Sequence, residues 1–422
     1  MIWLLIGYMF LFIHRPFEVW PSLASARIEL LYMLAIGPVW LALARKGWIA
    51  SRLHYAFFGF AAALVLSWLM SPWGKHCELT VENYFKLLVF YVLLVTVVRD
   101  EQGLRRIALA YLAVMMLYMT HSLVEYAHGR HVFRMGIPRL IGVDTSMGDP
   151  NSFGATLVYA LPFVLPFWNG APSRRLRWFL GAYVMLTVVC IGLTGSRSSL
   201  VGLLLFAFIV VLRSRWRGRL LVLGFFLAPL LWAALPASLQ TRFETIINPE
   251  VGPANARASA HSRIDGLIYG ARLWQENPLT GCGPGAWRPA SGLKLESHNL
   301  YGQLVGETGT LGAIAFAAVL IGLWTNFRRV KQLYRLHLAW GDDFPLQMAR
   351  AVGLAVVLLL FMGNFGHNLY RYSWLWYGGF LIIARHCVEQ RLARGAVFVA
   401  TRPRPAGAGR GAAGGPRLAY GS

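Results

Sequence analysis

Residues 178–235 read WFLGAYVMLTVVCIGLTGSRSSLVGLLLFAFIVVLRSRWRGRLLVLGFFLAPLLWAAL. Three apolar runs, 178–194, 199–212 and 220–235, follow one another here and contain no charged residue. Every arginine of the segment stands in one of the two short junctions between the runs. Runs of roughly 15 to 20 apolar residues bounded by charge are typical of helices that cross a hydrocarbon core of ~30 Å. The segment therefore predicts three consecutive transmembrane helices.

The same pattern extends over most of the chain. Hydrophobic residues make up 57% of the 422 residues and charged residues 14%, whereas about a quarter of a soluble domain is charged. No segment is typical of a β-strand. We therefore predict an all-α, polytopic integral membrane protein with about twelve transmembrane helices, at 1–13, 28–44, 55–70, 84–98, 107–126, 151–168, 178–194, 199–212, 220–235, 303–327, 350–366 and 371–384.

The positions of arginine and lysine predict the orientation of these helices, because short cytoplasmic connections accumulate basic residues. The outer connections after 178–194 and after 350–366 have Arg197 and Arg371 as their only arginines. The inner connections carry Arg45, Lys46, Arg52, Arg99, Arg105, Arg106, Arg174, Arg175, Arg177, Arg213, Arg215, Arg217, Arg219, Arg328, Arg329, Lys331 and Arg335. We therefore expect both termini in the cytoplasm. Much of the net charge of +22 then reflects basic loops beside membrane lipids, and we expect no nucleic-acid partner.

Two segments stand outside the helical pattern. Residues 236–302 form a long outer connection between the ninth and tenth helices, and connections of this length are usually functional or folded. Residues 395–422 are rich in Ala, Gly, Pro and Arg and have too few large apolar residues to fold. We therefore expect a transmembrane domain at 1–394 and a disordered basic cytoplasmic tail at 395–422.

Two motifs in the long connection predict local structure. Residues 262–275, SRIDGLIYGARLWQ, place five apolar residues at helical spacing on one side. Such a segment is typical of an amphipathic helix that lies on the membrane surface or over the mouth of a cavity. Residues 277–285, NPLTGCGPG, follow it, and their glycine and proline content requires a tight, irregular backbone.

A third motif, SHNLYGQLVGETG at 297–309, leads directly into the tenth helix. Ser297 is a suitable N-cap, which would place His298 in the first turn of that helix. The helix dipole disfavours an imidazolium there, so we expect a neutral His298 that can accept a proton. The alternative is that His298 only caps the helix or forms a hydrogen bond.

The order of these motifs is informative. His298-Asn299-x-Tyr301 precedes Glu307-x-Gly309, and the run 277–283 and an arginine-containing amphipathic helix come before them. The junction 194–199, TGSRSS, lies further upstream on the same side of the membrane. Together these motifs span roughly residues 140–365 and resemble the O-antigen ligase-related domain of the O-antigen ligase and polysaccharide polymerase superfamily.

The resemblance implies a membrane glycosyltransferase. Such an enzyme transfers a glycan from undecaprenyl diphosphate to a lipid A-core hydroxyl, or to another glycan, on the periplasmic face of a bacterial inner membrane. Ligases of this type resemble metal-independent, inverting enzymes, so we expect neither a metal nor a cofactor. The motif positions map to Arg197 and Arg263 as donor diphosphate-binding residues and to His298 as the general base. Guanidinium groups bind phosphate oxygens through a bidentate fork, and a neutral imidazole can deprotonate the acceptor hydroxyl.

Several other residues at the same outer face are candidates for supporting roles. Each has a polar side chain in or beside the region that resembles the O-antigen ligase-related domain. They are Asn299, Tyr301, Glu307, Arg272, Arg139, Asp149, Asn151 and Arg371. Asp149 or Asn151 beside Pro150 suits a helix cap, and we weigh capping above catalysis. Arg257 and Arg272 are alternatives to Arg263. Cys77 and Cys282 would share the outer compartment, so a disulfide between them is geometrically conceivable.

Three classes of function fit the sequence. The ligase attaches a finished glycan to lipid A-core, and the related polymerase extends an O-antigen or exopolysaccharide on its lipid carrier. The third class is a glycan transporter or flippase, which would place ionisable residues within the membrane spans and often shows internal repeats. The charges of this chain fall almost entirely at the ends of the apolar runs. We therefore favour the ligase, then the polymerase.

Overall fold

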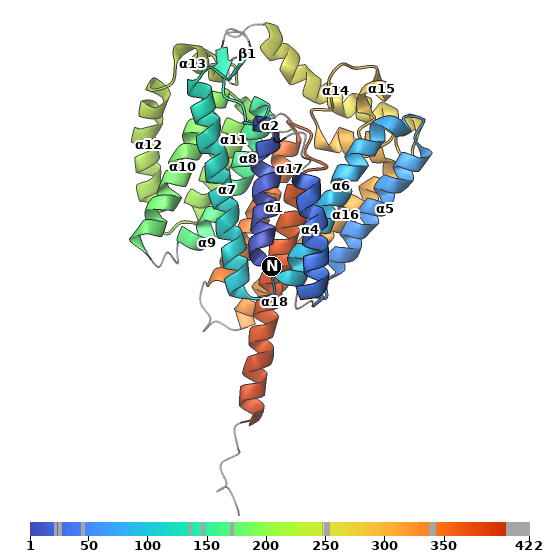
Figure 1. The fold of residues 1–422 in the computed structure, drawn as a ribbon. Coiled ribbons are helices and arrows are strands. Elements are labelled where there is room, and N and C mark those ends of the chain that lie inside the picture. Colours follow the sequence, from blue (N-terminus) through green and yellow to red (C-terminus); the bar gives the residue numbers. More distant parts are fainter. Residues whose placement is uncertain are drawn as a thin grey trace, which may run out of the picture.

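The computed structural model describes residues 1–20, 23, 28–43, 47–134, 137–144, 148–168, 173–246, 248, 254–336 and 343–401. Nearly all of this chain is helical, and the long helices run side by side in one bundle (Figure 1). Helices α13, α14 and α15 and strand β1 lie at one end of the bundle, which we call the site end. Met1 and the C-terminal part of α18 lie at the opposite end. This is the arrangement expected if both termini face the same side of the membrane.

The helices follow the apolar runs of the sequence closely. In the first half they are α1 (Ile2–His14), α2 (Pro16–Val19), α4 (Ile28–Leu43), α5 (Arg52–Met70), α6 (Gly74–Val97), α7 (Glu101–Ala127), α8 (Pro150–Ala160), the 3₁₀ helix η1 (Leu161–Val164) and α9 (Leu165–Trp168). In the second half they are α10 (Arg174–Thr194), α11 (Arg197–Arg213), α12 (Arg217–Ala233), α13 (Ala237–Glu244), α14 (Ala254–Glu276), α15 (Trp287–Ser291), α16 (Leu300–Leu336), α17 (Phe344–Gly363) and α18 (Tyr372–Thr401).

Each of the twelve apolar runs overlaps a helix over most of its length within the described residues, so the all-α fold predicted from the sequence is confirmed. In the described part of the chain, seven helices have the length and composition to cross a membrane: Ile2–Val19, Arg52–Met70, Gly74–Val97, Glu101–Ala127, Arg174–Thr194, Leu300–Leu336 and Phe344–Gly363. The number twelve and the cytoplasmic side of the termini stay predictions. Helix α18 includes the first residues of the tail expected to be disordered, and 402–422 lie outside the described residues.

The expectation that the chain contains no strand was wrong at one place. Strands β1 (Val132–Arg134) and β2 (Ile137–Arg139) form an antiparallel hairpin in the connection between α7 and α8. Val132 and Phe133 are exposed on β1, and Ile137 and Arg139 are buried on β2. The alternation is too short to stand out in a sequence dominated by helical runs.

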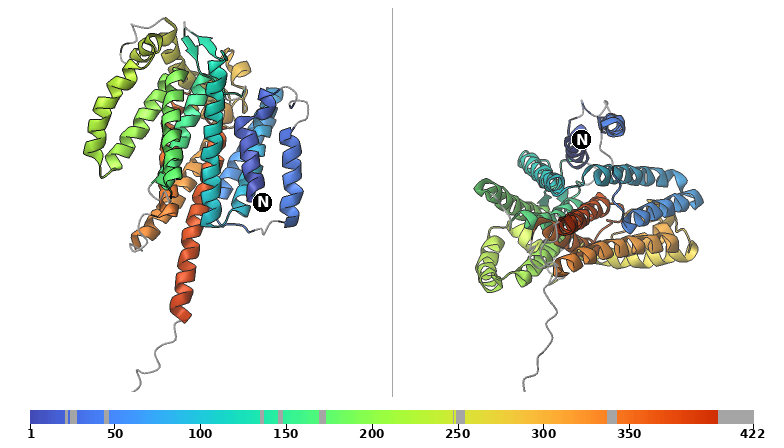
Figure 2. Two further views of the ribbon diagram at one scale, coloured as in Figure 1. Left: turned by 60° about the vertical axis from the view of Figure 1, so that its left-hand side comes forward. Right: turned by 90° about the horizontal axis from the view of Figure 1, so that it is seen from below.

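Helix α18 is central to the bundle. It packs against α6, α7, α16 and α17, and residues 372–384 are buried (Figure 2). Helix α12 is the opposite case, because none of its residues is buried and Phe225 and Phe226 are 75% and 65% exposed. An apolar helix exposed on all sides requires an apolar solvent, so α12 is suited to contact lipid acyl chains. The structure is that of a multi-pass membrane protein.

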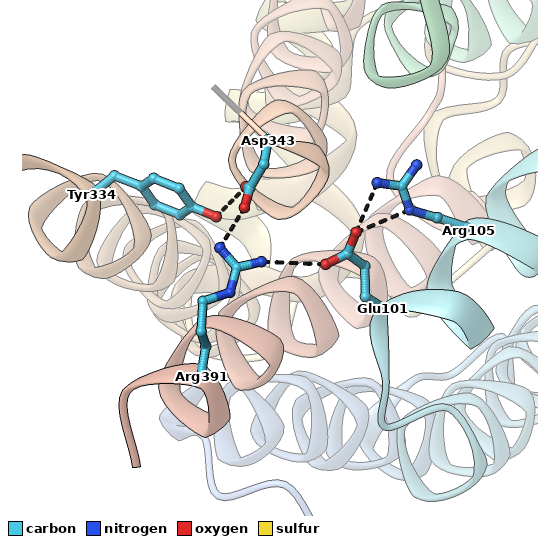
Figure 3. Close-up of polar contacts among 5 residues, drawn as sticks. All are labelled: Glu101, Arg105, Tyr334, Asp343 and Arg391. Carbon is cyan, nitrogen blue, oxygen red and sulfur yellow. Dashed lines mark hydrogen bonds and ion pairs between the residues drawn. The ribbon is translucent and has the colours of Figure 1, made fainter. Parts of the chain in front are cut away.

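A network of charged and polar side chains joins four helices at the end opposite the site. Arg391 of α18 pairs with Asp343, which precedes α17, and with Glu101 of α7, whose carboxylate lies 3.3 Å away (Figure 3). Arg105 donates to Glu101 at 2.7 Å, and the hydroxyl of Tyr334 of α16 donates to Asp343. These contacts join the ends of α7, α16, α17 and α18 on this side of the bundle.

Candidate functional site

Arg197 lies where α10 ends and α11 begins, at the site end of the bundle. Gly195 ends α10 in the left-handed conformation with φ 56°, and the side chain of Ser196 caps α11. Arg197 is the first residue of α11, as its place in the TGSRSS motif indicates, and its Nη1 donates to the hydroxyl of Thr245 at 3.0 Å. The position combines a guanidinium with the positive end of a helix dipole, which favours anion binding.

Helix α14 brings Arg263 to the same end. The helix begins at Ala254, so Arg263 does not open it as predicted from the sequence but lies within it. Gly266 and Gly270 face Gly302 and Gly306 of α16, and a Cβ built on Gly270 would lie 2.4 Å from the carbonyl oxygen of Gly302. Small residues at this spacing allow two helix backbones to approach closely. We call this contact the glycine seam.

The predicted apolar side of α14 faces away from the seam. Ile264, Leu267 and Ile268 are exposed, which suits contact with the membrane surface.

The glycine seam leads to a prediction for Gly270→Ala. The added methyl group meets backbone atoms of Gly302, so α14 must move away from α16 and carry Arg263 with it. Displacements of about 1 Å at a functional site can cost about 100-fold in rate, and we expect any activity that depends on Arg263 to fall about 10- to 100-fold. Gly181→Ala in α10 is the matched control, because nothing lies within 4 Å of its Cβ position. Equal activity of both variants would exclude the seam as the element that positions Arg263.

The glycine-rich turn at 277–285 pairs with the first part of α16. The backbone N–H groups of Cys282 and Gly283 donate to the carbonyls of Gly306 and Glu307 at 2.9 and 3.0 Å. The helix is kinked at Gly309, where φ is 62°, and a Cβ there would lie 2.5 Å from backbone atoms of Leu279. The turn therefore holds the kink of α16 by close backbone contact that requires glycine.

Glu307 is fully buried beneath this turn. Its Oε2 accepts hydrogen bonds from the backbone N–H of Gly285 at 2.9 Å and from the hydroxyl of Tyr370 at 2.7 Å, and Gln303 donates to the same carboxylate. Glu307 thus joins the glycine-rich turn to the segment between α17 and α18. A role of Glu307 in orienting His298 stays a hypothesis, because Glu307 lies nine residues further along the chain.

His298 lies just before α16 and not in its first turn, so the expected cap at Ser297 was wrong. The side chain of Asn299 caps α16 by accepting from the backbone N–H groups of Tyr301 and Gly302 at 2.9 and 3.1 Å. The hydroxyl of Ser297 instead bonds the backbone of Asn299. The carboxamide at the N-cap satisfies two orphan donors. Because the cap lies two residues later than predicted, the half-buried His298 lies in the connecting segment.

The turn between α17 and α18 completes the site. The ring of His367 lies 5.9 Å from the ring of His298, and the guanidinium carbon of Arg263 lies 4.9 Å from the ring of Phe365. Arg371 donates to the hydroxyl of Thr156 of α8 at 2.6 Å. Phe365 and Tyr370 had no part in the sequence argument, although the polar, glycine-containing run 363–368 at the end of an apolar helix is a signal for such a turn.

The electrostatics connect the two candidate arginines. Burial, and then the nearby guanidinium of Arg197, lower the pKa of Arg263 to about 10. This value is well above neutral pH, so both groups are cationic at physiological pH. Two cations held close together form an arrangement that an anionic ligand would stabilise.

The other predicted residues have varied positions. Asp149 caps α8 by accepting from the backbone N–H of Asn151 at 3.1 Å. Arg139 is buried and donates to the carbonyl of Thr194 at 2.6 Å and to Asn151 at 2.9 Å. Arg272 is exposed and pairs with Glu276, away from the glycine seam. The two hydrogen bonds of Arg139 hold the connection before α8 against the junction that carries Arg197.

Tyr301 and the cysteines are also placed by the structure. The hydroxyl of Tyr301 donates to the carbonyl of Leu360 at 3.0 Å and so joins α16 to α17. Cys77 and Cys282 are both buried in one small apolar cluster, and each is a free thiol in the structure. Among the described residues, no group of three or more His, Cys, Asp or Glu side chains is arranged to hold a metal ion.

The geometry defines a multi-pass membrane protein with two cationic arginines and two histidines at one end of its bundle. Residues 181–317 match the family model described as O-Antigen ligase, which supports an O-antigen ligase-related family for this chain. The match also supports a function of the ligase or polymerase type in general. The matched range, residues 181–317, includes Arg197, Arg263 and His298 and ends before the turn between α17 and α18. No curated protein matches the chain.

Proposed function

We propose that the protein is an O-antigen ligase-like glycosyltransferase. It transfers a glycan from undecaprenyl diphosphate to a hydroxyl of lipid A-core on the periplasmic face of a bacterial inner membrane. The observation that carries the proposal is that Arg197 lies near enough to Arg263 to lower its pKa, while α14 packs at Gly266 against Ser297 and Asn299, the residues that flank His298. The family match over residues 181–317 supports the same class of reaction.

The proposed reaction is a single displacement. The acceptor oxygen forms a bond to the anomeric carbon as the bond between that carbon and the diphosphate oxygen breaks, so the anomeric configuration inverts. The electron pair of the broken bond leaves with undecaprenyl diphosphate, and Arg197 and Arg263 stabilise the added negative charge. His298 takes the proton of the acceptor hydroxyl. Under this proposal the protein itself supplies the charge stabilisation and the base, with no cofactor.

The surrounding elements support these roles. The glycine seam positions Arg263 beside the start of α16, and the Ser196 cap and Thr245 hold Arg197 at the start of α11. Phe365 stacks on the guanidinium of Arg263 without neutralising it. The exposed apolar side of α14 would lie against the membrane, where the undecaprenyl chain of the donor resides.

The proposal is tested by deleting the gene in the source organism and separating the surface polysaccharide beside lipid A-core and undecaprenyl-linked glycan fractions. We expect long glycan to accumulate on undecaprenyl while lipid A-core stays bare. Single repeats on the carrier or the core would instead identify a polymerase. An unchanged distribution of glycan in every fraction would contradict both activities.

A further inference from the structure

His367 is a second histidine at the site, and it lies outside the residues that match the family model. Its ring centroid is 5.9 Å from that of His298, and the two ring planes are inclined by 31°. The Nδ1 atom of His367 is enclosed and has no hydrogen-bond partner within the described structure. A buried polar atom without a partner is uncommon in proteins and requires an explanation.

The turn that carries His367 is held by hydrogen bonds of three residues that follow it. The side-chain amide of Asn368 donates to the hydroxyl of Tyr159 at 3.1 Å and to the carbonyl of Leu359 at 2.8 Å. Tyr370 donates to the buried Glu307, and Arg371 donates to Thr156 of α8. These three residues all follow His367 in the chain, and their contacts with α8, α16 and α17 fix the backbone on that side of it. Its imidazole is therefore placed beside His298 by the fold and not by a flexible loop.

The charges around His367 keep its ring neutral. Burial lowers the pKa of His367 to about 4, and Arg371 and then His298 act in the same direction. Asp149 at the start of α8 opposes this shift, and Arg288 of α15, which pairs with Glu296 at 2.7 Å, adds to it. At neutral pH His367 is thus a neutral group with one nitrogen able to accept a hydrogen bond.

We propose that His367 is a positioning residue for His298, whose ring it holds and whose protonated form it stabilises by accepting a hydrogen bond, directly or through one water. The inference rests on the proposed transfer reaction. In that reaction the proton of the acceptor hydroxyl moves to His298 as the new carbon–oxygen bond forms. His367 receives no proton in this step. It accepts a hydrogen bond from the new N–H of His298, and the proton leaves to solvent after the product departs.

The charge balance explains why the second group is a histidine. Arg371 and Arg288 already make the region cationic, and an imidazolium at His298 adds a further positive charge. A cationic neighbour would oppose that charge, whereas a neutral acceptor stabilises it. A carboxylate at this position would pair with Arg371 and would not be free for His298. A neutral imidazole meets both requirements.

Two substitutions of His367 test the inference in an assay of transfer from an undecaprenyl diphosphate-linked glycan. His367→Leu removes the acceptor, and we expect kcat to fall about 10- to 100-fold, with the donor KM little changed. The acid limb of the pH profile should move to lower pH, because the protonated form of His298 loses a stabilising contact. His367→Gln keeps a neutral acceptor that cannot titrate, and it should recover most of kcat.

The controls separate this inference from the proposed function. His131→Leu replaces an exposed histidine in the connection before β1, at the same end of the bundle, and should leave the kinetics unchanged. Thermal unfolding in detergent reports on folding in each variant. If His298→Ala is inactive while His367→Leu transfers at the wild-type rate with an unshifted acid limb, the role of His367 is excluded and the proposed function stands. Equal losses in His367→Leu and His367→Gln with an unshifted acid limb would also overturn it, because they would indicate structural support alone. Wild-type transfer by His298→Ala would remove the base and with it this role.

Discussion

His298→Ala is expected to reduce glycan transfer by about 10²- to 10⁴-fold, the usual contribution of a positioned general base. The physical reason is that the acceptor hydroxyl is a poor nucleophile until it loses its proton. His298 lies before the first turn of α16, where Asn299 and not His298 satisfies the helix N-terminus. Removal of the imidazole should therefore leave the cap, and with it the fold, intact.

The measurement is the initial rate of transfer by purified protein, together with thermal unfolding in detergent. Asn299→Ala is the informative comparison, because it removes the cap and keeps the imidazole. It should lower the unfolding temperature, since loss of an N-cap costs about 0.5–2 kcal/mol. His298→Ala should lower the rate and leave the unfolding temperature close to that of the wild type. A rate for His298→Ala close to wild type would show that another group is the base.

The pH dependence gives an independent test of the same role. A protonated imidazole cannot accept a proton, so wild-type transfer should decline on the acid side of its optimum. The acid-side decline should disappear in the residual activity of His298→Ala. His367 does not account for this limb, because its pKa of about 4 keeps it neutral down to lower pH. Persistence of the same limb in the variant would assign it to a different group.

The sequence predicted the helices more completely than it predicted the site. A long apolar run indicates a segment that is buried in lipid or protein. Because this signal is contained within the segment itself, the sequence alone was enough to locate the helices. The N-cap of α16 was missed because Ser297 and Asn299 are both good caps, and the choice between them depends on tertiary contacts of the preceding segment. The β1–β2 hairpin was missed for a similar reason, since three-residue strands carry little periodicity.

The site itself could be predicted only in part. Arg197, Arg263 and His298 lie in motifs whose order along the chain is visible in the sequence. Arg371, beside the turn between α17 and α18, was also a candidate from the sequence. The contacts that hold this turn were not visible, because they depend on the packing of α17 and α18 against α8 and α16. The glycine seam shows the same limit. Nothing in the sequence around Gly270 and Gly302 distinguishes them from the other glycines of the chain. Their role in the close packing of α14 against α16 is visible only in the structure.

Arg197→Lys tests whether the donor is recognised by charge alone or by the planar fork of a guanidinium. Lysine keeps the positive charge at the start of α11 but presents a single ammonium in place of two parallel donors. In Arg197→Lys we expect kcat/KM for the undecaprenyl diphosphate-linked donor to fall about 10- to 100-fold. In Arg197→Ala we expect the same ratio to fall about 10²- to 10³-fold. Arg213→Lys, at the other end of the same helix, is the matched control and should have no effect.

A double substitution tests whether Arg197 acts together with Arg263. The charge of Arg197 lowers the pKa of Arg263, so the two guanidinium groups lie near each other, as the proposed contact of both with one diphosphate requires. If they stabilise the same leaving group, the loss in Arg197→Ala with Arg263→Ala should be smaller than the product of the two single losses. Inorganic pyrophosphate should also inhibit these variants less strongly than the wild type. The variants with the lowest kcat/KM should be the least inhibited. Full activity in Arg197→Lys would reduce Arg197 to a generic positive charge, and strictly multiplicative losses would assign the two arginines to separate steps.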